Sequence, residues 1–450
     1  MCGIVGYVGY DEAAGKIIEG LKKLEYRGYD SSGIAILSDK GIELNKCKGE
    51  IKNLENMIAG RIPSGTCGIG HTRWATHGAP SDVNSHPHMD QSGRVALVHN
   101  GIVENYVELK EALINEYGIK FKSETDSEVI AQLVGVKYNA NGGDLEKAVY
   151  DATKEMRGTY AIGVIAEDNT DKIVAYRKEA PLIAGLGKKS NFIASDIPAL
   201  LKYTNDIFLI ENDEMVICTP DSITIKDKDG KEVKREAMKI TWSVEDAEKG
   251  GYEHFMLKEI NEQPKVVAET LNRRIDEDGK IKLDGINLTK EELDKYNKIY
   301  IVACGTAYHA GLVGKYVIEK MAGIAVEVDV ASEFRYRDPF IDEKTLFIAI
   351  SQSGETLDTL MSLRLAKEKG ASVLSVVNVV GSSIARESDD VFYTWAGPEI
   401  AVASTKAYTT QLVCMYLIAL YLGDIRGTLT DEYRKFILEE LQQIPEKIQE

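Results

Sequence analysis

The sequence lacks any run of Lys or Arg residues. Its 450 residues include 54 Lys and Arg against 71 Asp and Glu, for a formal net charge of −17. An acidic chain without a basic tract is unsuited to polyanionic surfaces, so the composition argues against nucleic acid and anionic membranes as partners. Any anionic ligand must be held locally, by loop amides and helix N-termini.

Paired cysteines and long hydrophobic runs are also missing. The six cysteines are scattered and show no C-x-x-C spacing, so neither a disulfide framework nor a zinc ribbon is predicted. No apolar run reaches the roughly 18 residues of a membrane span, and the start lacks a basic segment followed by a long hydrophobic one. We therefore expect a cytoplasmic protein, and 450 residues allow two or three domains.

The first nine residues, M-C-G-I-V-G-Y-V-G, place a cysteine next to the initiator methionine. Methionine is usually removed before a small residue, which would leave the α-amino group and the thiol together on Cys2. Such an amine has a pKa of about 7.7–8.0, so at neutral pH it can accept the thiol proton and activate the nucleophile. The alternative is a structural cysteine buried on a short strand.

Five of the seven histidines fall between residues 67 and 101, but without an H-E-x-x-H motif or other metal-ligand spacing. A metal site is one interpretation, and a set of satisfied loop histidines is the other. The same stretch contains H-T-R-W-A-T-H-G (71–78), which places an Arg, a bidentate carboxylate binder, in a glycine-ended loop.

The strand V-A-L-V-H-N-G (95–101) ends in an Asn-Gly pair. This pair suits a hairpin turn, or an oxyanion hole built from the Asn100 amide and the Gly101 backbone N–H. Helices are expected at 104–117 and 126–138, and Asp126 either caps the second helix or faces a cationic ligand group.

The second half alternates strands and helices, which predicts a parallel, doubly wound sheet. Strands are expected at 298–303, 325–329, 345–350, 372–379 and 391–394. Two of them run into polar turns, Cys304-Gly305-Thr306 and Ser351–Thr356, and ligands of open α/β sheets bind at such carboxyl ends. No G-x-G-x-x-G follows the first of these strands and there is no P-loop Lys, so a sugar phosphate fits better than a dinucleotide or ATP. The alternative for the second turn is a Ser/Thr-rich helix cap.

We predict four segments from these patterns. They are a first domain at 2–225, a connection at 226–285 with a helix that stops before Pro264, a sugar-phosphate domain at 286–427, and the start of a further segment at 428–450.

At the N-terminus, C-G-I-V-G, H-T-R-W-A-T-H-G, H-P-H, H-N-G and E-T-D resemble the class II glutamine amidotransferases. Downstream, C-G-T, S-Q-S-G-E-T and E-I-A-V-A-S-T-K-A-Y-T-T-Q-L resemble the sugar isomerase (SIS) domain. In this order the two parts are similar to the glucosamine-6-phosphate synthase family of isomerizing aminotransferases. The resemblance implies an N-terminal nucleophile fold, a four-layer αββα sandwich, followed by an SIS domain with a doubly wound parallel sheet.

For the amidotransferase part, the resemblance implies that Cys2 attacks glutamine while Asn100 and Gly101 stabilise the oxyanion. Arg73 and Asp126 would bind the α-carboxylate and the α-ammonium of glutamine, and Trp74 and His86 would belong to the loop that covers the site. For the SIS part it implies that fructose 6-phosphate is bound by Thr306, Ser351, Gln352, Ser353, Thr356, Val402 and Ser404.

The same resemblance implies that ammonia passes between the two sites to give glucosamine 6-phosphate and glutamate in amino sugar biosynthesis. It implies no metal or organic cofactor, and a homodimer formed through the SIS domains. Ala307 departs from the family pattern, since many relatives have a Ser there that offers one more hydroxyl to the phosphate. The family continues into a second SIS domain with the isomerase residues, so we expect this chain to be a fragment without it; the alternative is a natural truncation with an incomplete isomerase site.

Two other functions remain open at this point. One is another class II amidotransferase, such as the phosphoribosyl-pyrophosphate-dependent one, although no acidic pyrophosphate-binding run follows a strand. The other is a non-catalytic sugar-phosphate sensor, against which the joint presence of Cys2, Arg73, Asn100 and Asp126 argues.

Overall fold

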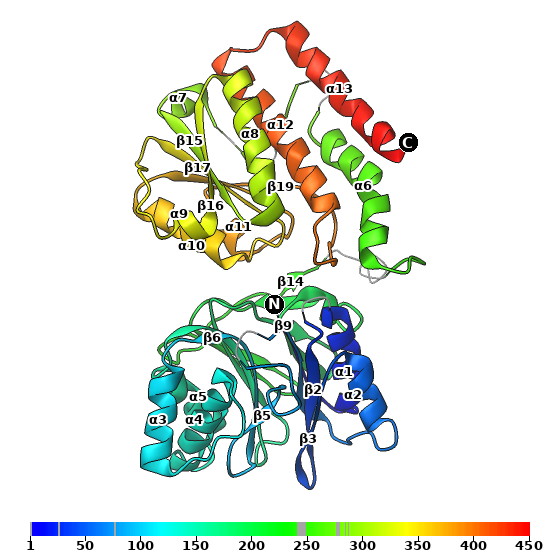
Figure 1. Cartoon of the computed structure of the whole chain (residues 1–450), viewed down its shortest axis with the longest axis vertical. Coiled ribbons are helices and arrows are strands. Elements are labelled where there is room, and N and C mark those ends of the chain that lie inside the picture. Colours follow the sequence, from blue (N-terminus) through cyan, green and yellow to red (C-terminus); the bar gives the residue numbers. More distant parts are fainter. Residues whose placement is uncertain are drawn as a thin grey trace. The chain divides into compact units, whose positions relative to one another are not determined.

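The computed structural model describes residues 2–25, 28–75, 78–240, 249–275, 280–283, 285–286 and 288–450. The chain divides into two compact units, Met1–Ala247 and Glu248–Glu450 (Figure 1). Each unit has hydrophobic cores of its own.

The first unit contains two sheets. The eight-stranded sheet has the order β14-β11-β9-β10-β1-β4-β2-β3, and its described pairs are antiparallel. Its strands are β1 (Gly3–Gly9), β2 (Ser31–Ser38), β3 (Gly41–Lys48), β4 (Cys67–Arg73), β9 (Ile183–Leu186), β10 (Ser190–Ala194), β11 (Asp206–Leu209) and β14 (Met238–Lys239). The six-stranded sheet, in the order β13-β12-β8-β7-β6-β5, consists of β5 (His88–Met89), β6 (Val95–Val103), β7 (Gly158–Ala166), β8 (Ile173–Lys178), β12 (Glu214–Cys218) and β13 (Ile223–Lys226).

Helices cover the outer faces of both sheets (Figure 1). The eight-stranded sheet is covered by α1 (Ala13–Leu24) and α2 (Ile51–Ile58), and a short 3-10 helix, η2 (Ile197–Ala199), packs on α1. The six-stranded sheet is covered by α3 (Tyr106–Tyr117), α4 (Asp126–Ala140) and α5 (Leu145–Thr153). One core lies between the sheets and another under α3–α5, so the predicted αββα sandwich is confirmed.

Strand alternation determines which side chains enter the space between the sheets. Ile4 and Val8 of β1, Cys67 and Ile69 of β4, and Ala96 and Val98 of β6 all belong to the core between them. Side chains two residues apart on a strand point to the same face. Cys2 therefore points to the same side of β1 as Ile4, His71 and Arg73 to the same side of β4 as Ile69, and Asn100 to the same side of β6 as Val98. Three strands from two sheets therefore direct these residues to one end of the same layer.

The second unit is built on a five-stranded parallel sheet in the order β16-β15-β17-β18-β19. The strands are β15 (Lys298–Ala303), β16 (Ala325–Val330), β17 (Thr345–Ser351), β18 (Ser372–Val377) and β19 (Asp390–Tyr393). This order places a topological switch point between β15 and β17. The predicted doubly wound sheet is confirmed, with strand bounds within two residues of those expected.

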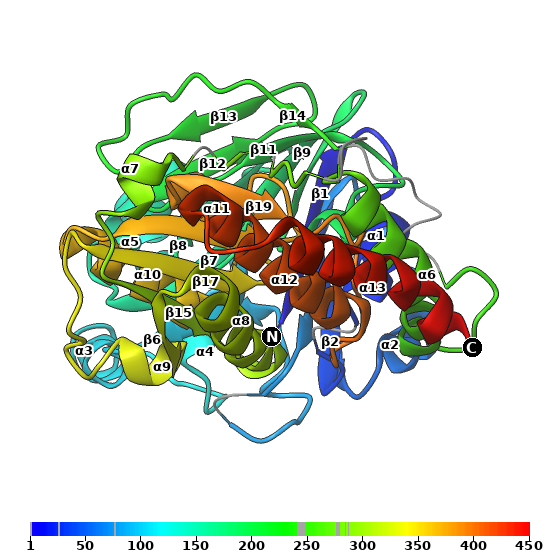
Figure 2. The same cartoon turned by 90° about the horizontal axis from the view of Figure 1, so that it is seen from above.

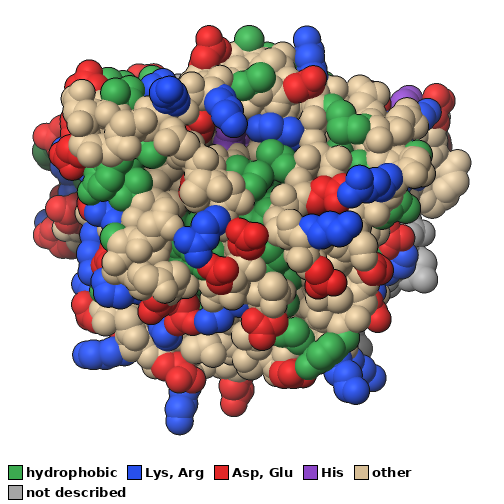
Figure 3. All heavy atoms as spheres, turned by 90° about the horizontal axis from the view of Figure 1, so that it is seen from below, with side chains coloured by type: hydrophobic (Ala, Val, Ile, Leu, Met, Phe, Trp, Pro, Cys, Tyr) green, Lys and Arg blue, Asp and Glu red, His purple; other side chains and the backbone are tan. Residues whose placement is uncertain are grey.

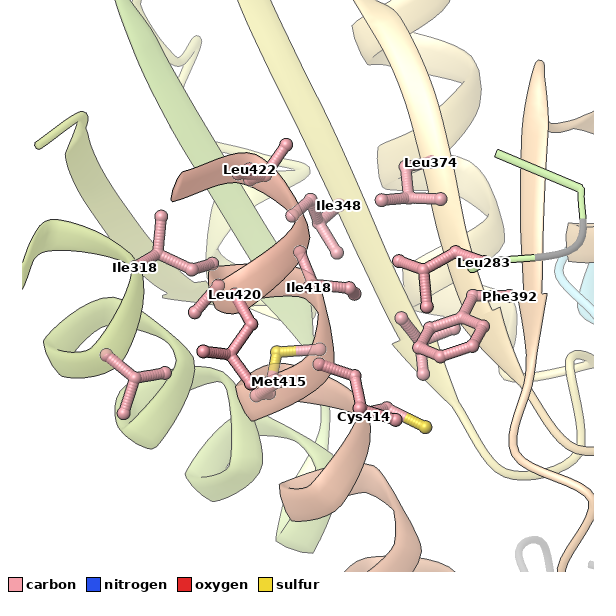
Figure 4. Packing of buried hydrophobic residues seen from close by; sticks show 14 of the residues in the cluster. Leu283, Ile318, Ile348, Leu374, Phe392, Cys414, Met415, Ile418, Leu420 and Leu422 are labelled. Carbon is pink, nitrogen blue, oxygen red and sulfur yellow. The ribbon is translucent and has the colours of Figure 1, made fainter. Parts of the chain in front are cut away.

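The two faces of this sheet bury different helices. Ile299, Ile301 and Ala303 face the core formed with α8 (Gly305–Ala322) and α12 (Lys406–Arg426), shown in Figure 4. Tyr300 and Val302 alternate with them and face the other core. That core includes α9 (Ala331–Phe334), α10 (Leu357–Glu368) and α11 (Ser383–Glu387), while α7 (Lys290–Leu293) packs on α12.

The prediction that a helix stops before Pro264 is wrong. Helix α6 runs from Phe255 to Asn272 with Pro264 inside it, and it packs against α12 and α13 (Asp431–Gln449), as Figure 2 shows. Pro264 has no N–H to donate to the carbonyl of Ile260 four residues earlier. The side chain of Gln263 donates to that carbonyl instead, at 3.2 Å, which compensates for the missing backbone hydrogen bond.

The division between the units lies beyond the predicted limit of 225. Strand β14 pairs with β11 and so extends the first unit past residue 226, and α6 packs into the second unit.

Helix α12 is apolar and long enough to cross a membrane by composition alone, but it packs between α8 and α6 as a core helix. On the face shown in Figure 3, acidic and basic side chains are mixed.

Candidate active sites

The Cys2 thiol lies against the backbone of Trp74, directly beyond strand β4. The Trp74 N–H donates a hydrogen bond to Sγ at 3.2 Å, and the thiol donates to the Trp74 carbonyl at 3.5 Å. A backbone N–H directed at sulfur stabilises negative charge on it. The surroundings of Cys2 therefore suit a nucleophile; Met1 lies outside the described residues.

Asn100 lies beside Cys2 on the neighbouring sheet. Its Nδ2 donates to the Cys2 carbonyl at 3.1 Å, and its side chain is 7% exposed. Gly101 has φ +125°, and a Cβ on it would lie 2.0 Å from the Thr159 carbonyl oxygen. Only glycine fits this backbone conformation, which places the Asn100 amide and the Gly101 backbone next to each other, as an oxyanion hole requires.

Arg73 and Asp126 are both buried near this site, each 4% exposed. Arg73 donates to the Gly78 carbonyl at 3.2 Å, and Asp126 accepts from the Val103 N–H at 3.0 Å. Helix α4 is capped by the Thr125 hydroxyl, which accepts from the Glu128 N–H. Asp126 is therefore not needed as the cap; its oxygens accept from the Val103 N–H and the Ser127 hydroxyl, and its pairing with a ligand stays a prediction.

Trp74 and His86 occupy different environments. Trp74 is 43% exposed and contacts Tyr29 edge to face at 5.3 Å, a placement compatible with a covering loop. His86 is only 4% exposed and stacks on His71, with ring centroids 4.1 Å apart. The His86 imidazole is therefore packed against the ring of His71 on β4; its place in the loop that covers the glutamine site stays a prediction.

Burial keeps three histidines of the 67–101 stretch, His71, His86 and His88, from acting as cationic groups. Desolvation lowers the pKa of His71 to about 3, and lowers the pKa of His86 and His88 well below the ordinary value. His99 Nδ1 lies 2.8 Å from the Ser127 hydroxyl. Among the described residues no group of three His, Cys, Asp or Glu side chains is arranged to hold a metal; His77 lies outside them.

The polar turn after β17 folds back on itself. The hydroxyls of Ser351 and Thr356 lie 3.0 Å apart, and Ser351 accepts from the Gly354 N–H at 3.0 Å. Ser353 accepts from the Glu355 N–H at 3.1 Å, and the Gln352 carbonyl accepts from Asn378. Thr356 precedes α10 but its side chain does not cap the helix. A helix N-terminus surrounded by hydroxyls is a suitable anion site.

The turn after β15 lies next to it at the switch point. Ala303 and Ile350 are partners in the parallel ladder, and Thr359 donates to Cys304 Sγ at 3.9 Å. Thr306 is exposed in the first turn of α8. The structure thus brings together the two turns that the sequence predicts to bind phosphate.

Val402 and Ser404 come from a different loop, the one before α12. Val402 is 77% exposed, and Ser404 donates to Glu399 at 2.8 Å. Glu399 also accepts from the N–H groups of Thr405 and Ala407. Val402 and Ser404 therefore lie on a loop that is held together by hydrogen bonds to the Glu399 carboxylate.

Two residues that position these sites were not predicted from the sequence: His71, which contacts Asn100, and Glu259, which holds the loop before α12. The contact of the Trp74 backbone N–H with the thiol was not predicted either. The spacing of Cys67, Ile69, His71 and Arg73 could have indicated a role for His71 in the site. His71 and Arg73 are two residues apart on one strand, so their side chains point to the same face. No comparable pattern marks Glu259.

Two family models match the chain: a glutamine amidotransferase domain at residues 71–202 and an SIS domain at residues 292–421. A protein of Clostridium tetani is 59% identical over 99% of this chain and 73% of its own length. A Clostridium perfringens protein is 57% identical and a Thermus thermophilus protein 50% identical, each over 100% of this chain and 73% of the relative. All three bear the name glutamine–fructose-6-phosphate aminotransferase (isomerizing).

The chain belongs to this aminotransferase family. The predicted family and its enzyme class, an isomerizing transaminase, are confirmed, and so are its amidotransferase and SIS parts. The chain spans about 73% of the length of these aminotransferases.

Proposed function

We propose that this aminotransferase hydrolyses glutamine at Cys2 and transfers the nitrogen to fructose 6-phosphate bound in the SIS domain. The products are glutamate and glucosamine 6-phosphate, the entry to amino sugar synthesis. The observation that carries the proposal is the placement of the Trp74 N–H and the Asn100 amide on either side of Cys2, at 3.2 Å from its sulfur and 3.1 Å from its carbonyl oxygen.

In this mechanism the α-amine of Cys2 takes the thiol proton, and the thiolate attacks the side-chain amide carbon of glutamine. The Asn100 Nδ2 and the Gly101 N–H stabilise the oxyanion of the tetrahedral intermediate. The amine returns its proton to the departing nitrogen, which leaves as ammonia, and water then hydrolyses the thioester to glutamate.

Substrate recognition follows from charge. Arg73 pairs with the α-carboxylate of glutamine and Asp126 with its α-ammonium, while Trp74 and His86 belong to the loop that covers the site. At the SIS site the phosphate is held by hydroxyls and helix N-termini, without a cation, through Thr306, Ser351, Gln352, Ser353 and Thr356, with the sugar near Val402 and Ser404.

We also propose a soluble, cytoplasmic homodimer formed through the SIS domains. The acidic composition and the mixed charge on the face in Figure 3 support the soluble, cytoplasmic part of this proposal, and the dimer is proposed from the family resemblance alone.

The test measures glutamate release from glutamine, with and without fructose 6-phosphate, and glucosamine 6-phosphate in the same sample. Cys2→Ala should abolish glutamate release, whereas Cys47→Ala should not, because burial raises the pKa of the Cys47 thiol and keeps it protonated. An unchanged rate in Cys2→Ala would remove Cys2 from the mechanism. Glutamate without amino sugar would support the glutaminase together with the expectation that residues 1–450 lack the isomerase residues, whereas both products would contradict that expectation.

A further inference from the structure

The His71 side chain connects the two sheets of the first unit. It extends from β4 of the eight-stranded sheet and is fully buried, with 0% exposure. Its Nε2 lies 3.0 Å from the His99 carbonyl oxygen and 3.0 Å from Asn100 Oδ1, both on β6 of the other sheet.

These contacts determine the tautomer of His71. A carbonyl oxygen and an amide oxygen can only accept hydrogen bonds, so the proton must be on Nε2. Asn100 is oriented consistently, since its Nδ2 donates to the Cys2 carbonyl at 3.1 Å while its Oδ1 receives the imidazole proton. The hydrogen bonds thus run in one direction, from His71 through Asn100 to Cys2.

The ring of His71 is held in place from its other side. His86 stacks on it with an interplanar angle of 16°, and the His86 Nδ1 in turn accepts the His99 N–H at 3.3 Å. Burial is the main reason that His71 stays neutral, and the nearby Arg73 and His99 also disfavour a positive charge. A neutral imidazole with its proton on Nε2 is a fixed donor, whose N–H is shared between Asn100 Oδ1 and the His99 carbonyl oxygen.

We propose that His71 is a positioning residue for the hydrolysis of glutamine, which holds the Asn100 amide with Nδ2 directed toward Cys2, where its second N–H can donate to the oxyanion. This inference rests on the proposed function. Without the imidazole N–H, the Asn100 amide can turn over and present Oδ1, which repels an oxyanion instead of stabilising it. His71 does not touch the substrate and does not act as a base.

Two substitutions separate this role from packing and from base catalysis. His71→Phe keeps an aromatic ring against His86 but removes the donor, whereas His71→Gln supplies an N–H near the Nε2 position without a basic group. We expect His71→Phe to lower kcat for glutamine hydrolysis by about 100-fold, the order of losing one oxyanion donor, with the KM for glutamine nearly unchanged. We expect His71→Gln to recover most of the loss.

Alkylation of Cys2 by iodoacetamide provides the control, because this reaction forms no oxyanion. We expect the same alkylation rate in His71→Phe as in the unsubstituted chain. Unchanged kcat in His71→Phe would overturn the proposal, and so would a His71→Gln variant as inactive as His71→Phe, which would indicate base catalysis. Glutamine hydrolysis absent from the unsubstituted chain would overturn the proposed function itself.

A measurement on the unsubstituted chain covers the case in which His71→Phe does not fold. In ¹⁵N spectra of the histidine side chains we expect His71 as the Nε2–H tautomer, with no titration between pH 5 and 8. The Nδ1–H tautomer, or a titration in this range, would contradict the donor role.

Discussion

The Glu259 carboxylate accepts a hydrogen bond from the Ile400 backbone N–H at 2.6 Å, and a second from the Ala401 N–H at 3.0 Å. Glu259 lies on α6 and is only 2% exposed, while Ile400 and Ala401 precede Val402 in the loop before α12. Nearby, Lys406 pairs with Glu262 of the same helix at 2.6 Å. Helix α6 therefore holds the loop that carries Val402 and Ser404.

Glu259→Ala should loosen this loop, because it leaves two N–H groups without their acceptor. We expect a loss of roughly 1–3 kcal/mol in the free energy of unfolding, and weaker binding of fructose 6-phosphate by calorimetry. Glu269→Ala on the same helix is the matched control, since the Glu269 side chain is 44% exposed and pairs only distantly with Lys265. Equal affinities in both variants would show that α6 does not position the sugar loop.

The buried histidines predict acid sensitivity of the first unit. The pKa values of His71, His86 and His88 are lowered in the folded state, to about 3 for His71. Below the ordinary value near 6.5, the unfolded chain binds protons that the folded chain does not. The stability that His71 contributes above pH 6.5 is therefore lost as the pH falls toward 3, by up to about 1.4 kcal/mol per pH unit, and the lowered pKa values of His86 and His88 add losses of the same sign.

Denaturant unfolding between pH 7 and pH 4 measures this loss. In His71→Phe the unfolded state binds one proton fewer, so the numbers of protons bound by the unfolded and folded states differ less. The free energy of unfolding should therefore change less steeply with pH. A slope identical to that of the unsubstituted chain would show that His71 is protonated in the folded state.

Gly101→Ala should inactivate glutamine hydrolysis, because the added Cβ would meet the Thr159 carbonyl oxygen at 2.0 Å and displace β6 from β7. Gly118→Ala is the control: Gly118 has φ +66°, also positive, but nothing lies within 4 Å of its added Cβ. We expect the control to lose roughly 1–2 kcal/mol of stability from backbone strain and to retain its activity. Steady-state kinetics and thermal unfolding distinguish the two; an active Gly101→Ala would contradict the oxyanion role of this segment.

At the SIS site, a crowded glycine, Gly354, can likewise be compared with a glycine of similar φ in open space. Gly354→Ala would place a Cβ 1.9 Å from the Ser382 hydroxyl at φ +65°, whereas Gly323→Ala has a similar φ of +63° and open space. We expect at least about a tenfold loss of affinity for fructose 6-phosphate in the first variant, one tenfold step being about 1.4 kcal/mol, and an unchanged affinity in the second. Inorganic phosphate as a competitor would show whether the loss concerns the phosphate.

Much of both sites could be predicted from local sequence. The turn at 351–356 follows from a buried strand that runs into polar residues, and the structure shows it. The strand predicted to end at Asn100-Gly101 instead continues to Val103 and pairs with β7 throughout, so the Asn-Gly pair is not a hairpin turn. The burial of His86 could not be predicted, since it depends on a stacking partner, His71, from another strand. The continuation of α6 through Pro264 was missed because the compensating donor, Gln263, acts by side-chain geometry.

The alternation that directs Cys2, His71, Arg73 and Asn100 to one layer has a consequence for insertions and deletions. Removing a single residue within β4, between Cys67 and His71, would turn the imidazole and the guanidinium toward α1 and direct their neighbours into the core. The loops between these strands can change in length without that effect. Length variation in this chain should therefore be tolerated between the strands of the glutaminase and not within them.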